Sequence, residues 1–224
     1  MVACYNKTKL GDSSMSGAVN RLLFAINNSN FVVQTYCVLT AYLLLIVSVS
    51  CVSYFVIPRF LYMPLALADT AMWIACGFFG WRNPIKVVLP LFSVITGLFL
   101  GLIARQHGAT FAASSVITIV AFVSLSFYAY RSQRDFSFLG AVLNVCFYVS
   151  LVGCVLAIFF PIKLLTLGLS LFGVLIFVGW ILYDTQQIRD NASFDYTPEH
   201  GAFDLIMDIV ALRSWLQSLL EKLD

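Results

Sequence analysis

The chain has 224 residues, of which 61% are hydrophobic and only 11% are charged, and its formal net charge at neutral pH is +2. A soluble domain carries about a quarter charged residues, so this composition excludes a water-exposed surface over most of the molecule. The small net charge, without any basic run, argues against nucleic acid as a partner. The lipid bilayer is therefore the expected environment.

Residues 1–30 form a polar leader, which we expect to be cytoplasmic and flexible, with room for a short amphipathic helix over Ala18–Ile26. A bilayer-spanning helix needs about 20 mostly apolar residues. Six such runs follow, separated by short breaks with proline or charged residues: Phe31–Ile57, Leu61–Trp81, Val87–Ala104, Ala109–Tyr130, Phe136–Phe160 and Leu164–Ile188. Their continuously apolar character favours helices over the alternating strands of a barrel.

The final segment, Ala202–Leu220, differs because it carries Asp204, Asp208 and Arg213. Each such residue costs about 2.5–3.5 kcal/mol at the centre of a membrane-inserted helix. The segment therefore either lies at the membrane interface or runs through the middle of the bundle. We favour the middle, which predicts an all-α membrane protein in which residues 31–224 form six transmembrane helices around a central seventh.

Lysines and arginines indicate the orientation of this bundle. Eight of them lie on the N-terminal side of the spans and four on the opposite side, and the more positive side is the cytoplasmic one. The sequence thus predicts a multi-pass integral membrane protein with a cytoplasmic N-terminus. A bacterial inner membrane and a eukaryotic or virus-encoded endomembrane, such as that of the endoplasmic reticulum or Golgi, both fit.

Ionisable residues inside membrane spans are functional candidates by default. Asp184 lies near the cytoplasmic end of the sixth span, and Asp208 lies about two turns into the final helix. Because one loop joins these helices, we expect the two carboxylates to face each other at similar depth. Two such groups in a low dielectric share a proton and titrate as a coupled unit, or offer hard oxygens to calcium. The alternative is an interhelical hydrogen bond that serves packing only.

Four further charged residues extend this set. Asp69, in the second span, either completes the acidic cluster or bonds to a nearby serine or threonine hydroxyl, and Asp204 lies one turn before Asp208, at the mouth of the site. Arg213 either pairs with a buried carboxylate or extends along its own stem to the far interface. Arg82 is either a latch that reaches the Asp184 region or an ordinary positive flank of the second span.

Enzymatic chemistry is not indicated. The two histidines, His107 and His200, lie in separate loops, and the sequence contains neither a zinc-binding motif of histidine and glutamate nor a nucleophile elbow. We expect no cofactor other than calcium as a transported or transiently bound ion.

Four stretches resemble the transmembrane Bax inhibitor motif family, which includes bacterial calcium-leak homologues: Gly179–Gln186, Ala202–Leu220, Tyr128–Gly140 and Leu61–Asp69. The resemblance implies a pH-sensitive calcium leak in which Asp184 and Asp208 form the sensor and gate and Asp69 belongs to the ion path, with calcium bound transiently by these three. In bacterial members an arginine latches the closed form. Here the nearest arginine, Arg82, is displaced by about two positions.

The final helix also departs from the family pattern. Ala211 stands where the family usually has asparagine, and Arg213 replaces an apolar or aromatic residue. A fixed positive charge near the path would weaken cation passage. Two functions remain open: a calcium leak channel that regulates the calcium content of a compartment and thereby cell death, and a non-conducting anti-apoptotic protein that binds membrane-protein partners.

Overall fold

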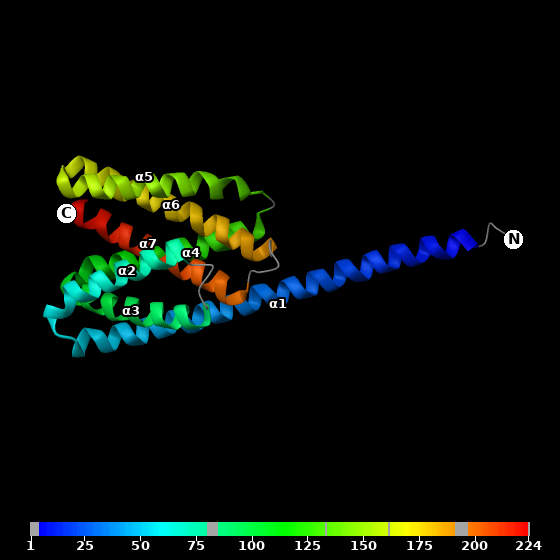
Figure 1. Cartoon of the computed structure of the whole chain (residues 1–224), viewed down its shortest axis with the longest axis horizontal. Coiled ribbons are helices and arrows are strands. Elements are labelled where there is room, and N and C mark those ends of the chain that lie inside the picture. The colour runs from blue at the N-terminus through cyan, green and yellow to red at the C-terminus, as the bar shows by residue number, and fades with distance from the viewer. Residues whose placement is uncertain (1–4, 80–84, 133, 161, 191–196, 224) are drawn as a thin grey trace.

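The computed structural model describes residues 5–79, 85–132, 134–160, 162–190 and 197–223. Within these ranges the chain forms seven α-helices, which run back and forth between the two ends of one bundle (Figure 1). We call the end where α6 leads into α7 the near end, and the end where α7 finishes the far end.

The first helix, α1 (Tyr5–Val56), is 52 residues long and extends beyond the bundle at the near end (Figure 1). We expected a flexible leader before residue 31, whereas the helix already begins at Tyr5. The first proline of the sequence is Pro58, so no proline interrupts helical hydrogen bonding before it. The helix ends at Val56 because the residue that precedes a proline disfavours helical geometry.

The remaining helices match the predicted spans to within a few residues. A short 3-10 turn, Arg59–Leu61, precedes α2 (Tyr62–Phe79). The others are α3 (Ile85–Gln106), α4 (Gly108–Arg131), α5 (Ser137–Phe159), α6 (Lys163–Asp190) and α7 (Pro198–Leu223). In the described part of the chain, α3 to α6 and residues Asn30–Val56 of α1 are long and apolar enough to cross a membrane. The predicted class, an all-α membrane protein, is confirmed.

The last helix occupies the interior of the bundle. It packs closely against α1, α3, α4 and α6, and its buried residues include both aspartate and arginine. The prediction that this charged segment runs through the middle of the bundle is therefore confirmed, with four of the other six helices packed around it. In the described ranges, α2 and α5 do not pack closely on α7 or on each other, and cavities lie between them.

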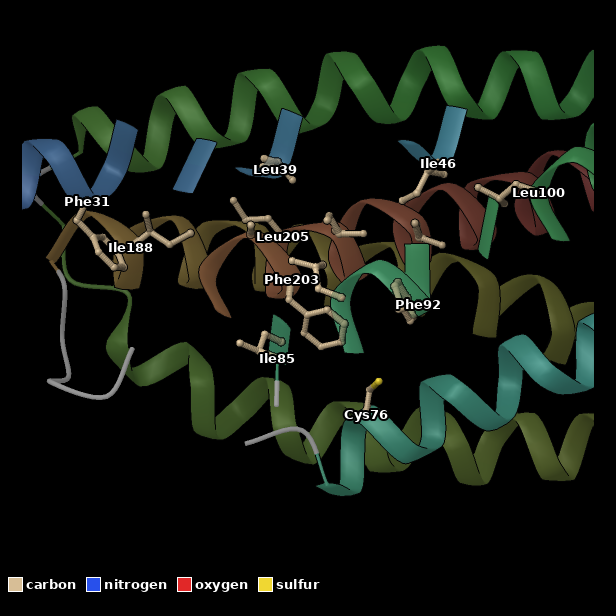
Figure 2. Packing of buried hydrophobic residues seen from close by; sticks show 14 of the residues in the cluster. Phe31, Leu39, Ile46, Cys76, Ile85, Phe92, Leu100, Ile188, Phe203 and Leu205 are labelled. Carbon is tan, nitrogen blue, oxygen red and sulfur yellow. The ribbon is translucent and has the colours of Figure 1, made fainter. Parts of the chain in front are cut away.

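Apolar side chains from three helices form the larger part of the core. Figure 2 shows Phe31, Leu39 and Ile46 of α1 and Phe92 of α3 in one cluster with Phe203 and Leu205 of α7. The rings of Phe92 and Phe203 meet edge to face, with their centroids 5.4 Å apart. These contacts hold α7 in a fixed position along α1 and α3.

Small residues bring α1 and α3 close together. A Cβ atom added at Gly101 would lie 2.4 Å from the carbonyl oxygen of Ser50, and one at Gly97 would lie 2.9 Å from the Cβ atom of Val49. The Ser53 hydroxyl donates a 2.6 Å hydrogen bond to the carbonyl oxygen of Leu98. Glycines spaced by four residues are a common means of close helix approach in membranes.

Candidate functional site

The carboxyl groups of Asp184 and Asp208 meet between α6 and α7. Both residues are buried, with relative exposures of 6% and 5%, and their carboxyl groups lie within hydrogen-bonding reach of each other. The prediction that they face each other at similar depth is therefore confirmed. The Oδ2 atom of Asp208 is buried and, among the described residues, has no hydrogen-bond partner.

Helical spacing places this pair in an otherwise apolar interface. On α6, Ile181, Asp184 and Ile188 are buried at intervals of three and four residues. On α7, Leu205 and Leu212 flank Asp208 in the same way. Each helix therefore presents one apolar stripe that is interrupted by one acid.

A cavity of about 560 Å³ lies beside the pair, between α2, α5, α6 and α7. We call it the acidic cavity because three carboxylates line it: Asp184, Asp204 and Asp208. Asp204 is partly exposed and lies within electrostatic reach of the other two. This position agrees with the predicted place of Asp204 at the mouth of the site.

Asp69 lies apart from these three acids. The Thr96 hydroxyl on α3 donates a 2.7 Å hydrogen bond to Asp69 Oδ1, so the alternative of a threonine partner is confirmed. Asp69 lines a second cavity and not the acidic one. Within the described ranges no three His, Cys, Asp or Glu side chains come together as a metal-binding group. The expected calcium ligand set of Asp69, Asp184 and Asp208 is therefore not brought together, because α2 presents Asp69 to α3.

Arg213 follows neither of the two predicted alternatives. It is only 6% exposed, and no carboxylate of a described residue forms an ion pair with it. Its guanidinium donates hydrogen bonds to Gln217 (2.8 Å) and Ser214 (3.3 Å) and lies 4.7 Å from the centre of the Phe111 ring. The Nε atom is buried without a partner in the described part of the chain. Asp69 attracts this charge from a longer distance.

A row of polar side chains continues from Arg213 to the far end of α7. Gln217 donates a 2.7 Å hydrogen bond to Glu221, and Glu221 lies 3.0 Å from His107 Nδ1 at the start of α4. The Lys222 ammonium group donates to the Thr166 carbonyl oxygen and to the hydroxyls of two serines, Ser170 and Ser218. The far end of α7 is thus tied to the beginning of α6.

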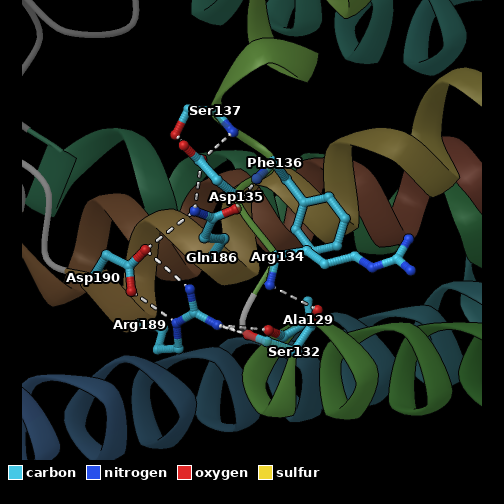
Figure 3. Close-up of polar contacts among 9 residues, drawn as sticks. All are labelled: Ala129, Ser132, Arg134, Asp135, Phe136, Ser137, Gln186, Arg189 and Asp190. Carbon is cyan, nitrogen blue, oxygen red and sulfur yellow. Dashed lines mark hydrogen bonds and ion pairs between the residues drawn. The ribbon is translucent and has the colours of Figure 1, made fainter.

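The predicted latch, Arg82, lies outside the described residues. The near end carries a different polar cluster, which joins the α4–α5 loop to the end of α6 (Figure 3). Gln186 accepts a 2.5 Å hydrogen bond from the Phe136 amide and donates to Asp135. Arg189 donates to the carbonyl oxygens of Ala129 and Ser132. This cluster fixes the end of α6 only two residues beyond Asp184.

Asp135, an acid of this cluster, lies in the α4–α5 loop. Its Oδ1 atom accepts a 2.5 Å hydrogen bond from the Ser137 hydroxyl and a 2.8 Å hydrogen bond from the Ser137 amide. Together with Gln186, these hydrogen bonds hold the pKa of Asp135 below its usual value, because they stabilise the ionised form.

The fold and the site define a multi-pass helical membrane protein with a carboxylate pair enclosed beside a central helix. The chain belongs to the family described as "Inhibitor of apoptosis-promoting Bax1", whose model matches residues 28–223. The resemblance noted from the four short stretches is therefore confirmed over most of the chain.

Relatives of this chain occur in a virus, a plant and a bacterium. It is 31% identical over 153 residues to the "Golgi anti-apoptotic protein" of vaccinia virus strain Lister, which covers 67% of this chain and 57% of that protein. It is 30% identical over 183 residues to "Protein LIFEGUARD 1" of Arabidopsis thaliana, and the aligned region covers 74% of this chain and 77% of that protein. An uncharacterised protein of Caulobacter vibrioides is 29% identical to this chain over 171 residues, and the aligned region covers 70% of this chain and 68% of that protein.

Proposed function

We propose that this protein is a pH-gated calcium leak channel, in which the proton shared by Asp184 and Asp208 keeps α6 and α7 together. The observation that carries the proposal is the close approach of two buried carboxyl groups inside the bundle, within hydrogen-bonding reach of each other. A hydrogen bond between two carboxyl groups requires that at least one of them hold a proton. When that proton leaves, two adjacent negative charges in a low dielectric repel each other strongly.

The acidic cavity supplies a place for the permeating ion. It brings Asp204 alongside the pair, and carboxylate oxygens are the ligands that calcium prefers. A partly exposed acid at its mouth would raise the local concentration of cations. In this mechanism calcium is the transported ion, held briefly by Asp184 and Asp208, and protons act as the gating ligand.

Reconstituted vesicles test this function. The full-length protein is inserted into liposomes that contain a calcium-sensitive dye, and calcium entry is followed over a series of pH values. We expect a flux that changes with pH for the natural sequence and a flux that does not for Asp184→Asn and Asp208→Asn, because an amide cannot exchange the proton. Asp190→Asn is the matched control, since Asp190 lies on the same helix but does not line the cavity. A pH-dependent flux that persists in both substituted proteins would contradict the mechanism.

The names of the relatives favour a second function. The viral relative is called an anti-apoptotic protein, and a non-conducting protein that binds membrane-protein partners would suit that name. Liposomes without any other protein separate the two functions, because a binding protein carries no calcium across them. We favour the leak, since binding alone gives no role to a pair of buried acids.

A further inference from the structure

Two cavities adjoin on the side of the bundle where α2 and α5 stand apart. The acidic cavity is followed by a second one of about 370 Å³, which contains Asp69. Both are lined by the same four side chains: Trp73 of α2, Phe147 and Tyr148 of α5, and Phe177 of α6. These shared side chains place the two cavities next to each other, and we call the pair the hollow, which extends from the carboxylate pair along α7 toward Trp215.

The second cavity, which we call the apolar cavity, has little to offer a polar guest. Besides Tyr148, three hydroxyl side chains line it, and each of these three donates its hydrogen to a carbonyl oxygen of its own helix: Thr70 to Ala66, Ser150 to Phe147 and Ser214 to Val210. One oxygen of Asp69, Oδ1, accepts a hydrogen bond from Thr96. The rest of the lining is aromatic or aliphatic, and cavities of this kind stay dry and take up apolar molecules.

The acidic cavity has the opposite character. It is lined by three carboxylates, and its described lining contains no lysine or arginine. Asp208 lines the cavity, and its buried Oδ2 atom lacks a partner among the described residues, so a guest that reached this atom would supply the missing hydrogen bond. Aromatic rings of Trp180 and Tyr148 also face the cavity, and ring faces attract ammonium groups. A donor that carries positive charge fits this end.

Exposed side chains at the rim of the hollow indicate that such a guest enters from the lipid bilayer. Three side chains at its rim are exposed on the outside of the bundle: Ile74 of α2, and Tyr148 and Leu151 of α5. These are outer faces of helices in a membrane, so hydrocarbon is the medium beside them. A molecule can therefore pass from the bilayer into the apolar cavity without crossing water.

We propose that the joined cavities bind an amphiphile with an amine headgroup, whose ammonium group lies at Asp208 and whose alkyl chain fills the apolar cavity. The three acidic side chains of one end and the mostly apolar lining of the other select this chemistry together. An anionic lipid would bring its headgroup against acidic side chains, and a free amine without a chain would leave the apolar cavity unfilled.

Quenching of tryptophan fluorescence tests the proposal, because Trp73 and Trp215 line the apolar cavity. The full-length protein is placed in bilayers of phosphatidylcholine and titrated with a long-chain alkylamine that carries bromine at the end of its chain. The alcohol and the carboxylic acid of the same brominated chain are titrated in parallel. We expect saturable quenching by the amine, at least about tenfold tighter than by the alcohol, since a charge-assisted hydrogen bond contributes about 1.5–3 kcal/mol.

Substitutions assign the signal to the hollow. Asp208→Asn should weaken amine binding at least about tenfold, Thr70→Phe should abolish it by filling the apolar cavity, and Trp215→Phe should remove part of the quenching. Asp190→Asn, outside both cavities, should bind as the natural sequence does. Thr70→Phe keeps every acid in place and thus remains informative if Asp208→Asn does not fold.

Three outcomes would overturn the proposal: quenching that is equal for amine, alcohol and acid, quenching that does not saturate, and binding that is unchanged in both Asp208→Asn and Thr70→Phe. The measurement requires no ion flux. A protein that binds the amine without conducting calcium would refute the leak alone, and one that conducts without binding would refute this inference alone.

Discussion

The hydroxyl of Thr96 on α3 donates a 2.7 Å hydrogen bond to the carboxylate of Asp69 on α2. This bond joins two helices at a point where α2 has no close contact with α7 in the described ranges. A buried carboxylate that loses its donor retains the cost of desolvation without the compensating bond. Thr96 is therefore a structural partner of an acid that the family resemblance assigns to the ion path.

Thr96→Val should lower the stability of the protein by about 1–3 kcal/mol, because it leaves Asp69 without this donor. Thermal unfolding in detergent measures the change. Thr118→Val is a matched control, since the hydroxyl of the buried Thr118 donates to the Ser114 carbonyl oxygen within its own helix, at 2.7 Å, and to no other described residue. Equal losses in the two variants would show that the Asp69 bond contributes nothing specific.

Gly101→Ala should separate α1 from α3. The added Cβ would lie 2.4 Å from a backbone oxygen of α1, and because backbone cannot rotate away, overpacking of this kind costs about 1–3 kcal/mol. Gly168→Ala on α6 is the control, since nothing lies within 4 Å of its added Cβ, and alanine should leave stability unchanged or slightly higher. The prediction fails if both variants unfold at the temperature of the natural sequence.

Asp135 should titrate below the ordinary aspartate value of about 3.9. A lowered pKa in the folded state means that its hydrogen bonds stabilise the α4–α5 loop at every pH above the ordinary value. This contribution is lost as the pH falls through the lower, folded-state pKa. Carboxyl NMR resonances, followed during acidification, measure the pKa directly. Ser137→Ala removes one of the donors, and the pKa of Asp135 should rise toward its usual value; an unchanged titration would contradict the assignment.

Arg213→Met should be tolerated or stabilising. Methionine retains packing against Phe111, and it removes a buried charge that has no ion-pair partner among the described residues. Replacement of such buried charges by apolar residues is often neutral or favourable. If the chain conducts, removal of this positive charge should also increase calcium flux, whereas Arg213→Lys should not. A less stable protein with unchanged flux would show that Arg213 serves the structure through Gln217.

The buried acid pair could be predicted from the sequence for a simple reason. Aspartates are costly in a membrane, and Asp184 and Asp208 lie at comparable distances from the one connection between their helices, so pairing was the natural solution. The spans were predictable because proline and charged residues mark their ends. The course of α7 through the interior followed from the same cost argument.

Other parts of the site left weaker traces in the sequence. Thr96 is a neutral residue in an apolar run, and no pattern marks it as the partner of Asp69. The row Arg213, Gln217 and Glu221 has a spacing of four residues, which places side chains on one helix face and would have indicated the polar contacts of Arg213. The separation of α2 from α5 depends on packing between segments far apart in the sequence, which the pattern of apolar residues along each helix does not predict.

The attachment of Lys222 to the first turns of α6 has a consequence for how α7 can move. Two hydrogen bonds from Lys222 and one between the hydroxyls of Ser170 and Ser218 hold this end, whereas Asp208 lies about 21 Å away along the helix at 1.5 Å per residue. If α7 tilted about this attached end, a tilt of only about 5° would displace Asp208 by roughly 2 Å. Such a displacement would break a hydrogen bond while the opposite end stays in place.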